Sequence, residues 1–78
     1  MKARDVIRDI MKSSGVTNAT LAHRMNMSIA ATWDLIGKEK NQFDMRTSKL
    51  TPALTALDYK LVAIPRDEKV PKGGYVID

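Results

Sequence analysis

The sequence predicts a mainly helical, compact chain, with four short helices followed by a β-hairpin. Apolar residues recur at helical spacing, and hydroxyl residues stand where two of the helices would begin. Two apolar segments rich in strand-forming residues flank a Pro- and Gly-rich stretch near the end of the chain, which is typical of a hairpin. We expect a single domain, with residues 1–58 forming its helical part and residues 59–78 forming the hairpin.

The first helix is expected over residues 3–13. Its apolar stripe, spaced to face a core, consists of Val6, Ile7, Ile10 and Met11. Its charged residues, expected on the solvated face, are Arg4, Asp5, Arg8, Asp9 and Lys12. Ser14 and Gly15 should end this helix, since glycine readily adopts the left-handed conformation found after helices.

Residues 17–37 predict two short helices joined by a tight turn. Thr17 can cap a helix over residues 18–25, and Ser28 can cap a second helix over residues 29–36. Asn26 lies in the turn and tolerates a left-handed backbone better than most residues. Two capped helices this close together are typical of a helix-turn-helix.

The apolar positions of these two helices predict how they pack. Val16 can pack on Leu21 just before the first of them. The residues expected to face inward are Leu21, Ala22, Met25, Thr32, Leu35 and Ile36. The Thr32 hydroxyl then needs a partner, such as a backbone carbonyl one turn earlier. Gly37 is expected to end the second helix in the left-handed conformation.

A fourth helix is expected after a polar loop over residues 38–46, which Phe43 and Met45 would anchor to the core. Its buried stripe consists of Leu50, Leu54 and Leu57. Pro52 should lie in the first turn, because a proline deeper in a helix removes a backbone hydrogen bond. The helix would therefore begin between Thr47 and Thr51 and end near Asp58.

Residues 59–64 and 75–77 are the two strand candidates, separated by a charged turn region over residues 65–74. An isolated two-stranded hairpin is only marginally stable in water. We therefore expect this hairpin to pack on the helices or to pair with the same hairpin of a second subunit. Such pairing across a two-fold axis would make it the dimerisation element.

The charge of the chain favours a polyanionic partner. The formal net charge is +4, with 13 basic and 9 acidic residues. Residues 1–26 carry a net charge of +3 and residues 37–49 a net charge of +2, whereas residues 27–36 carry −1. The basic surplus thus flanks the second helix of the predicted helix-turn-helix, where contacts to phosphates would fall.

The residues needed for catalysis or metal binding are scarce. The chain has no cysteine, and His23 is its only histidine, beside Arg24 on a helix. We predict no catalytic residues, no metal site, no cofactor and therefore no enzyme. The N-terminal residues interleave charges with apolar residues, and no apolar run reaches membrane-spanning length. We expect a cytoplasmic protein with no membrane partner.

Residues 17–38 resemble the lambda-repressor-like, or Cro/XRE-type, helix-turn-helix family. The matching residues are Thr17, Asn18, Leu21, Ala22, Met25, Ser28, Leu35, Gly37 and Lys38. The stretch LTALDYKLVAIP is similar to the last helix and following strand of small family members, so the resemblance covers roughly residues 3–64. It implies a small sequence-specific transcriptional regulator of the phage or mobile-element repressor type. Such a regulator binds double-stranded DNA as a homodimer, with the helix over residues 29–36 in the major groove.

The family's pattern also implies which residues contact DNA. The residues expected to face the bases are Ile29, Ala30, Trp33 and Asp34. The residues expected to contact phosphates are Asn18, Ser28, Lys38, Lys40, Asn41 and Gln42. Asn18 stands where the family often has a phosphate-binding glutamine. Asn26 stands where the family prefers glycine, and Thr32 stands where it has isoleucine or valine.

The predicted base-facing residues leave a second hypothesis open. They include no Arg, Lys, Asn or Gln, the side chains that usually read base edges, so readout would be biased to A·T pairs or depend on DNA shape. Ile29 and Trp33 are spaced to form one apolar patch, which is typical of a protein-binding surface. The alternative is therefore a protein-interaction module or antitoxin with a protein partner, and a third possibility for Trp33 is simple burial in the core.

Overall fold

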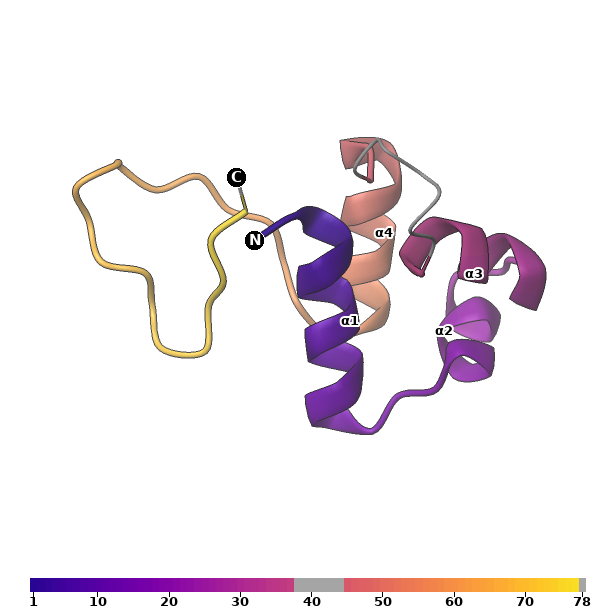
Figure 1. The fold of residues 1–78 in the computed structure, drawn as a ribbon. Helices are drawn as coiled ribbons and strands as arrows, with labels where there is room; N and C mark the ends of the chain where they lie inside the picture. The colour runs from indigo at the N-terminus through magenta and orange to yellow at the C-terminus, as the bar shows by residue number, and fades with distance from the viewer. Residues whose placement is uncertain (38–44, 78) are drawn as a thin grey trace.

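The structure is a computed structural model that describes residues 1–37 and 45–77, and these residues form four α-helices (Figure 1). The helices are α1 (Ala3–Ser14), α2 (Asn18–Arg24), α3 (Ile29–Ile36) and α4 (Thr47–Ala56). α1 and α4 lie side by side, and α2 and α3 pack together against this pair. The mainly helical fold with four helices is thus confirmed.

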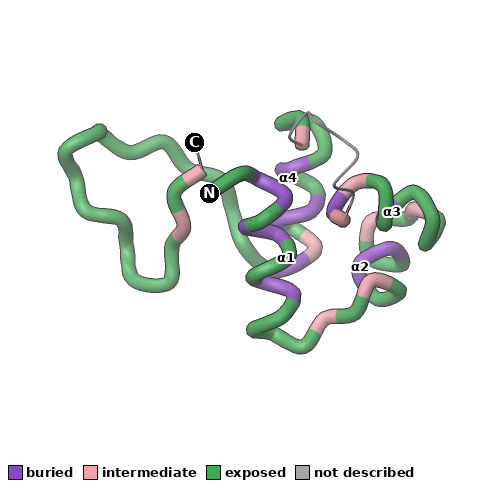
Figure 2. The backbone as a smooth tube through the Cα atoms, in the orientation of Figure 1, coloured by how far each residue is buried: buried purple, intermediate pink, exposed green. Residues whose placement is uncertain are grey.

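The core lies where the apolar stripes of the helices meet. Val6, Ile7 and Ile10 of α1 are almost completely buried, as the helical spacing predicted. Figure 2 shows that the buried residues gather along the facing sides of α1 and α4 and on the inner sides of α2 and α3. The rest of this cluster consists of Ala3, Met11, Leu21, Ile36, Leu50, Ala53, Leu54 and Leu57.

One charged residue of α1 departs from the prediction. Arg4 was expected on the solvated face, but it is buried. An arginine can bury its methylene stem along an apolar surface while its guanidinium keeps polar contacts, so its charge alone does not place it on the outer face. Asp5 and Arg8 remain on the solvated face, where their side chains approach to 4.0 Å.

The predicted helix ends are confirmed at four positions. The Thr17 hydroxyl accepts the backbone N–H of Thr20 at 3.1 Å, and the Ser28 hydroxyl accepts that of Ala31 at 3.0 Å. Gly15 follows α1 with a φ of 70°, and Asn26 has a φ of 55° in the turn after α2. These hydrogen bonds satisfy N–H groups that a helix start would otherwise leave unpaired.

Pro52 does not lie in the first turn of α4, contrary to the prediction. The helix begins at Thr47, so Pro52 falls in its second turn and cannot donate a hydrogen bond to the carbonyl of Ser48. Ser48 is exposed, and water can satisfy that carbonyl. The buried stripe Leu50, Leu54 and Leu57 extends to both sides of the proline, and its burial outweighs one lost backbone bond.

Met45 packs against the core as predicted, whereas Phe43 lies outside the described residues. The predicted C-terminal β-hairpin is wrong: residues 59–77, here called the C-terminal arm, contain neither strand nor helix. The arm leaves the helices after α4, runs out on the side of α1 away from α2 and α3, and returns to the start of α1 (Figure 1).

The contacts of the arm explain why its two apolar segments do not pair with each other. The Tyr75 hydroxyl donates to the carboxylate of Asp9 at 2.6 Å, and the terminal amine of Met1 donates to the Val76 carbonyl at 3.1 Å. The rings of Tyr59 and Tyr75 lie 6.3 Å apart. The returning segment is therefore held by α1, and a two-stranded ladder, which is weak on its own, does not form.

Candidate nucleic-acid interface

α2 and α3 meet at a tight turn that the backbone itself closes. The N–H of Met27 donates to the carbonyl of Ala22 at 2.9 Å, and the left-handed Asn26 lets the chain reverse there. Leu21 and Ala22 are buried beneath the turn. The sequence thus places two short, capped helices in contact, with α3 on the outside of the molecule (Figure 1).

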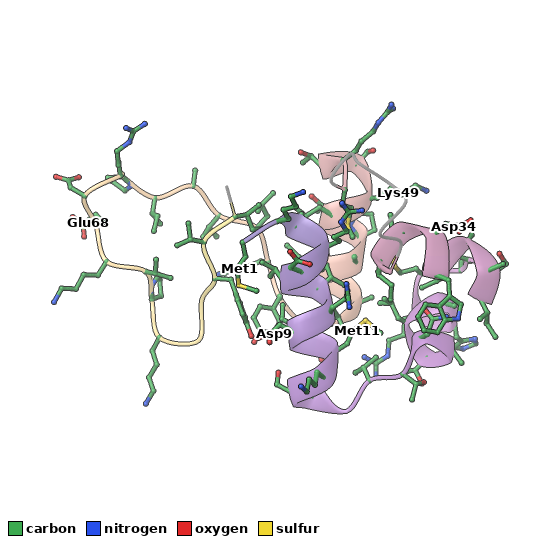
Figure 3. All side chains as sticks on the ribbon, viewed as in Figure 1. Met1, Asp9, Met11, Asp34, Lys49 and Glu68 are labelled. Atoms are coloured by element: carbon green, nitrogen blue, oxygen red, sulfur yellow. The ribbon has the colours of Figure 1, made fainter. Side chains whose placement is uncertain are left out.

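α3 has one buried and one exposed face. Thr32 and Ile36 are buried, and Leu35 packs partly against the core, as predicted. The Thr32 hydroxyl donates to the carbonyl of Ser28 at 2.9 Å, which is the carbonyl one turn back that its burial requires. The residues predicted to face the bases are all exposed: Ile29, Ala30, Trp33 and Asp34. Figure 3 labels Asp34 on this helix.

Trp33 is the largest side chain on the exposed face, and it is 50% exposed, so it is not a core residue. Its indole lies against Gly37, where an added Cβ would come within 3.1 Å of the ring atom Cε3. Gly37 has a φ of −120°, so the predicted left-handed helix end is wrong at this position. The close approach of the indole accounts for the glycine instead.

Asn18 links the starts of the two helices. Its side-chain amide nitrogen donates to the carbonyl of Ile29 at 3.3 Å, and its Oδ1 is buried with no hydrogen-bond partner among the residues that the structure describes. An amide nitrogen carries two hydrogens, so one N–H of this side chain is not used by the bond to Ile29. The Ser28 hydroxyl accepts from Ala31 and still has its own hydrogen to donate.

The positive charge of the described residues lies outside α3. Asp34 is the only charged residue of α3. Arg24 ends α2 and donates from Nη1 to the carbonyl of Ala56 at 2.9 Å, while Arg46 and Lys49 are exposed at the start of α4. Figure 3 labels Lys49 there. The predicted phosphate contacts Lys38, Lys40, Asn41 and Gln42 lie outside the described residues.

Arg24, Arg46 and Lys49 were not predicted as individual site residues. The signal that could have found them is the basic surplus on both sides of residues 27–36. In the described part of the chain, no group of three or more His, Asp or Glu side chains is placed to hold a metal ion. The helices described there are all too short or too polar to cross a membrane.

Comparison with protein-family models, with curated proteins and with solved structures finds no match to this chain. The resemblance to the lambda-repressor-like family therefore stays a prediction from the residues quoted above.

Proposed function

We propose that this protein binds duplex DNA by placing α3 in the major groove and acts as a small transcriptional regulator. The observation that carries this proposal is the division of α3, which buries Thr32 and Ile36 and leaves the opposite face exposed beside a tight turn. An α-helix with its side chains is about 10–12 Å in diameter. The major groove is about 12 Å wide and admits a helix.

The exposed face of α3 supports a particular kind of base readout. The Ile29 and Ala30 side chains are apolar and suit the methyl groups of thymine. The Asp34 carboxylate can accept a hydrogen bond from the amino group of cytosine, and the Trp33 indole offers one N–H donor. Because no side chain on this face can bind guanine or adenine in the bidentate manner, we expect modest sequence discrimination with a preference for thymine-containing steps.

Affinity in this proposal comes mainly from the phosphates. Asn18 and Ser28 retain donors at the starts of α2 and α3, and Arg46 and Lys49 add positive charge at the start of α4. A chain with a net charge of +4 gains from the release of counterions when it binds a duplex. Binding should therefore weaken steeply as salt is raised.

The direct test is the fluorescence anisotropy of a labelled random duplex, titrated with the protein at about 50 and about 200 mM salt. Trp33 is the only tryptophan, so its emission should also change as the duplex binds. We expect measurable binding at low salt and a large loss at high salt. Absence of binding at low salt, or binding with no change in tryptophan emission, would contradict the placement of α3.

A matched pair of variants tests whether the exposed face of α3 contacts the DNA. Asp34→Asn removes a carboxylate from the exposed face of α3, and Asp67→Asn removes one from the C-terminal arm. We expect Asp34→Asn to bind random duplex DNA about tenfold more tightly, because the base-facing carboxylate no longer repels the polyanionic duplex and asparagine can bind adenine. Asp67→Asn should differ little from the unmodified chain. Equal effects of the two substitutions would show that only net charge matters.

A second candidate function is protein binding through the same face, as in an antitoxin. The observation that favours it is the half-exposure of Ile29 and Trp33, at 53% and 50%, on adjacent turns of α3. Large apolar side chains exposed together often mark protein interfaces. Titration with duplex DNA separates the candidates, because this one predicts weak DNA binding or none at low salt.

A further inference from the structure

The centre of the exposed face of α3 is formed by two side chains of opposite chemistry. Thr32 is completely buried, and each residue turns a helix by about 100°, so the residues two positions before and after Thr32 lie roughly opposite it. Those residues are Ala30 and Asp34, and both are exposed. Ile29 and Trp33 each precede one of them by one position, so they form the flank of this face on one side.

Ala30 and Asp34 act as one small surface. They are four positions apart on the helix, so their Cβ atoms are neighbours at about 5–6 Å. Ala30 presents only a methyl group, whereas the Asp34 carboxylate accepts hydrogen bonds and donates none. The centre of the face therefore pairs an apolar contact with a hydrogen-bond acceptor one turn away.

This pair selects among the groups that bases present in the major groove. Guanine and thymine present the acceptors O6, N7 and O4, which a carboxylate disfavours, whereas cytosine presents its N4 amino group. Adenine presents its N6 amino group beside the acceptor N7, and thymine presents its C5 methyl group. In an A·T pair the adenine amino group and the thymine methyl group are separated by the acceptor O4. None of the four unmodified bases thus carries an amino donor and a methyl group side by side.

We propose that α3 recognises 5-methylcytosine in duplex DNA, an inference that rests on the proposed placement of α3 in the major groove. The Asp34 carboxylate accepts a hydrogen bond from the N4 amino group, and the Ala30 methyl group packs on the C5 methyl group. In this base the two groups are carried by adjacent ring atoms with no acceptor between them, so a single base satisfies both side chains. Unmodified cytosine lacks the methyl group, and thymine lacks the amino donor.

The rest of the face favours the same base. Ile29 and Trp33 are 53% and 50% exposed, so a methylated groove wall removes more apolar surface from water against them than an unmethylated one. Asp34 is the only charged residue of α3, and its negative charge lowers affinity for a polyanionic duplex in general. The carboxylate therefore gains only where an amino donor faces it.

The test compares the binding of the full chain to three duplexes of one random-sequence pool, by fluorescence anisotropy at about 50 mM salt. The first duplex is unmodified, and in the second 5-methylcytosine replaces cytosine. In the third N6-methyladenine replaces adenine, which places a methyl group in the major groove away from a cytosine amino group. We expect about fourfold tighter binding of the second duplex, the gain from burying one methyl group, and no gain for the third.

Two variants assign the preference to the centre of the face. Ala30→Ser puts a hydroxyl on the methyl group that contacts the base, and Ala31→Ser makes the same change at the next exposed position of the same helix. We expect Ala30→Ser to lose the preference for 5-methylcytosine and Ala31→Ser to keep it, with unchanged helical content by circular dichroism in both.

The outcomes separate this inference from the proposed function. Equal binding of the unmodified and the 5-methylcytosine duplexes would overturn the inference alone, whereas absence of binding to all three duplexes would overturn the proposed function with it. An equal gain from the two methylated bases, or a preference that Ala30→Ser retains, would also overturn the inference.

Discussion

The helices and the C-terminal arm are both rich in apolar residues, but only the helices bury them. Val6, Ile7 and Ile10 of α1 are at most 1% exposed, whereas Leu61, Val62 and Ile64 of the arm are 43–56% exposed. Apolar content alone therefore does not predict burial in this molecule. Burial also depends on the backbone conformation, which determines whether the apolar side chains of a region can pack against another part of the chain.

The difference has a physical cause. A helix satisfies its own backbone and presents its apolar residues on one stripe, which α1 buries against α3 and α4. The arm has its apolar residues in the consecutive run 61–64, and in an extended chain these point alternately to opposite faces. Covering them needs partners for the side chains and for the backbone, and no backbone hydrogen bond joins residues 60–64 to the described helices.

The largest expected effect comes from making the same substitution in both regions. Ile7→Ala should destabilise the protein by about 2–5 kcal/mol, because Ile7 is fully buried and its truncation leaves a cavity. Ile64→Ala should change the free energy of unfolding of the monomer by less than about 0.5 kcal/mol, because Ile64 is largely exposed. Urea unfolding followed by circular dichroism, at a concentration where the chain is monomeric, measures both. Comparable losses would mean that the arm belongs to the core after all.

The contrast between the helices and the arm also explains which parts of the fold could be predicted from the sequence. The bounds of α3 and the caps at Thr17 and Ser28 were predicted correctly, because helical spacing and capping are local signals. The hairpin was not, because pairing between residues 59–64 and 75–77 depends on what else competes for them. Here α1 binds the segment 75–77 through the hydrogen bond from Tyr75 to Asp9, and no local sequence pattern predicts that bond.

The candidate site likewise has features that the sequence predicted correctly and one that it did not. The exposure of Ile29, Ala30, Trp33 and Asp34 was predicted from the helical period that also buries Thr32 and Ile36. Gly37 was misread because glycine after a helix usually signals a left-handed residue, whereas here it accommodates a ring from the preceding turn. That contact depends on the rotamer of Trp33, which the sequence does not specify.

A smaller effect is expected at the start of α3. Ser28→Ala removes the hydroxyl that accepts from Ala31 and should destabilise the helical region by about 1 kcal/mol. This corresponds to roughly 4–8 °C in the melting temperature of a chain of this size. Ser48→Ala is the matched control, because Ser48 is an exposed residue inside α4 with no capping hydrogen bond. A melting temperature that falls equally in both variants would show that the cap of α3 contributes nothing particular.

Gly37→Ala probes the exposed face of α3 without replacing a base-facing residue. The new methyl group would lie 3.1 Å from the Trp33 ring, so the indole must move by a few tenths of an ångström. At a φ of −120° alanine itself is unstrained, and we expect stability to change by less than about 1 kcal/mol. The emission of Trp33 should change and DNA affinity should fall. In a Trp33→Ala background the affinity should no longer respond to Gly37→Ala, and a persisting response would rule out the indole as the cause.

The smallest effect is expected where the arm meets the helices. The hydrogen bond that Tyr75 donates to the Asp9 carboxylate, together with partial desolvation, raises the pKa of Tyr75 above its ordinary value. A raised folded-state pKa means that the bond contributes its stability in full below the unfolded pKa of about 10, and that this contribution is lost as pH rises through the higher folded-state value. Tyr75→Phe should therefore lower stability slightly at neutral pH and remove part of the alkaline loss.

Tyr59→Phe is the control for this prediction, since it keeps the ring contact with Tyr75 and leaves the bond to Asp9 in place. Ultraviolet absorbance of ionised tyrosine should show one group titrating late in the unmodified chain and in Tyr59→Phe, but not in Tyr75→Phe. If the late group persists in Tyr75→Phe, the arm is not held to α1 by this bond. The arm would then differ from the helices even more than the structure shows, because its return to α1 would depend on the bond to Met1 and on apolar contact alone.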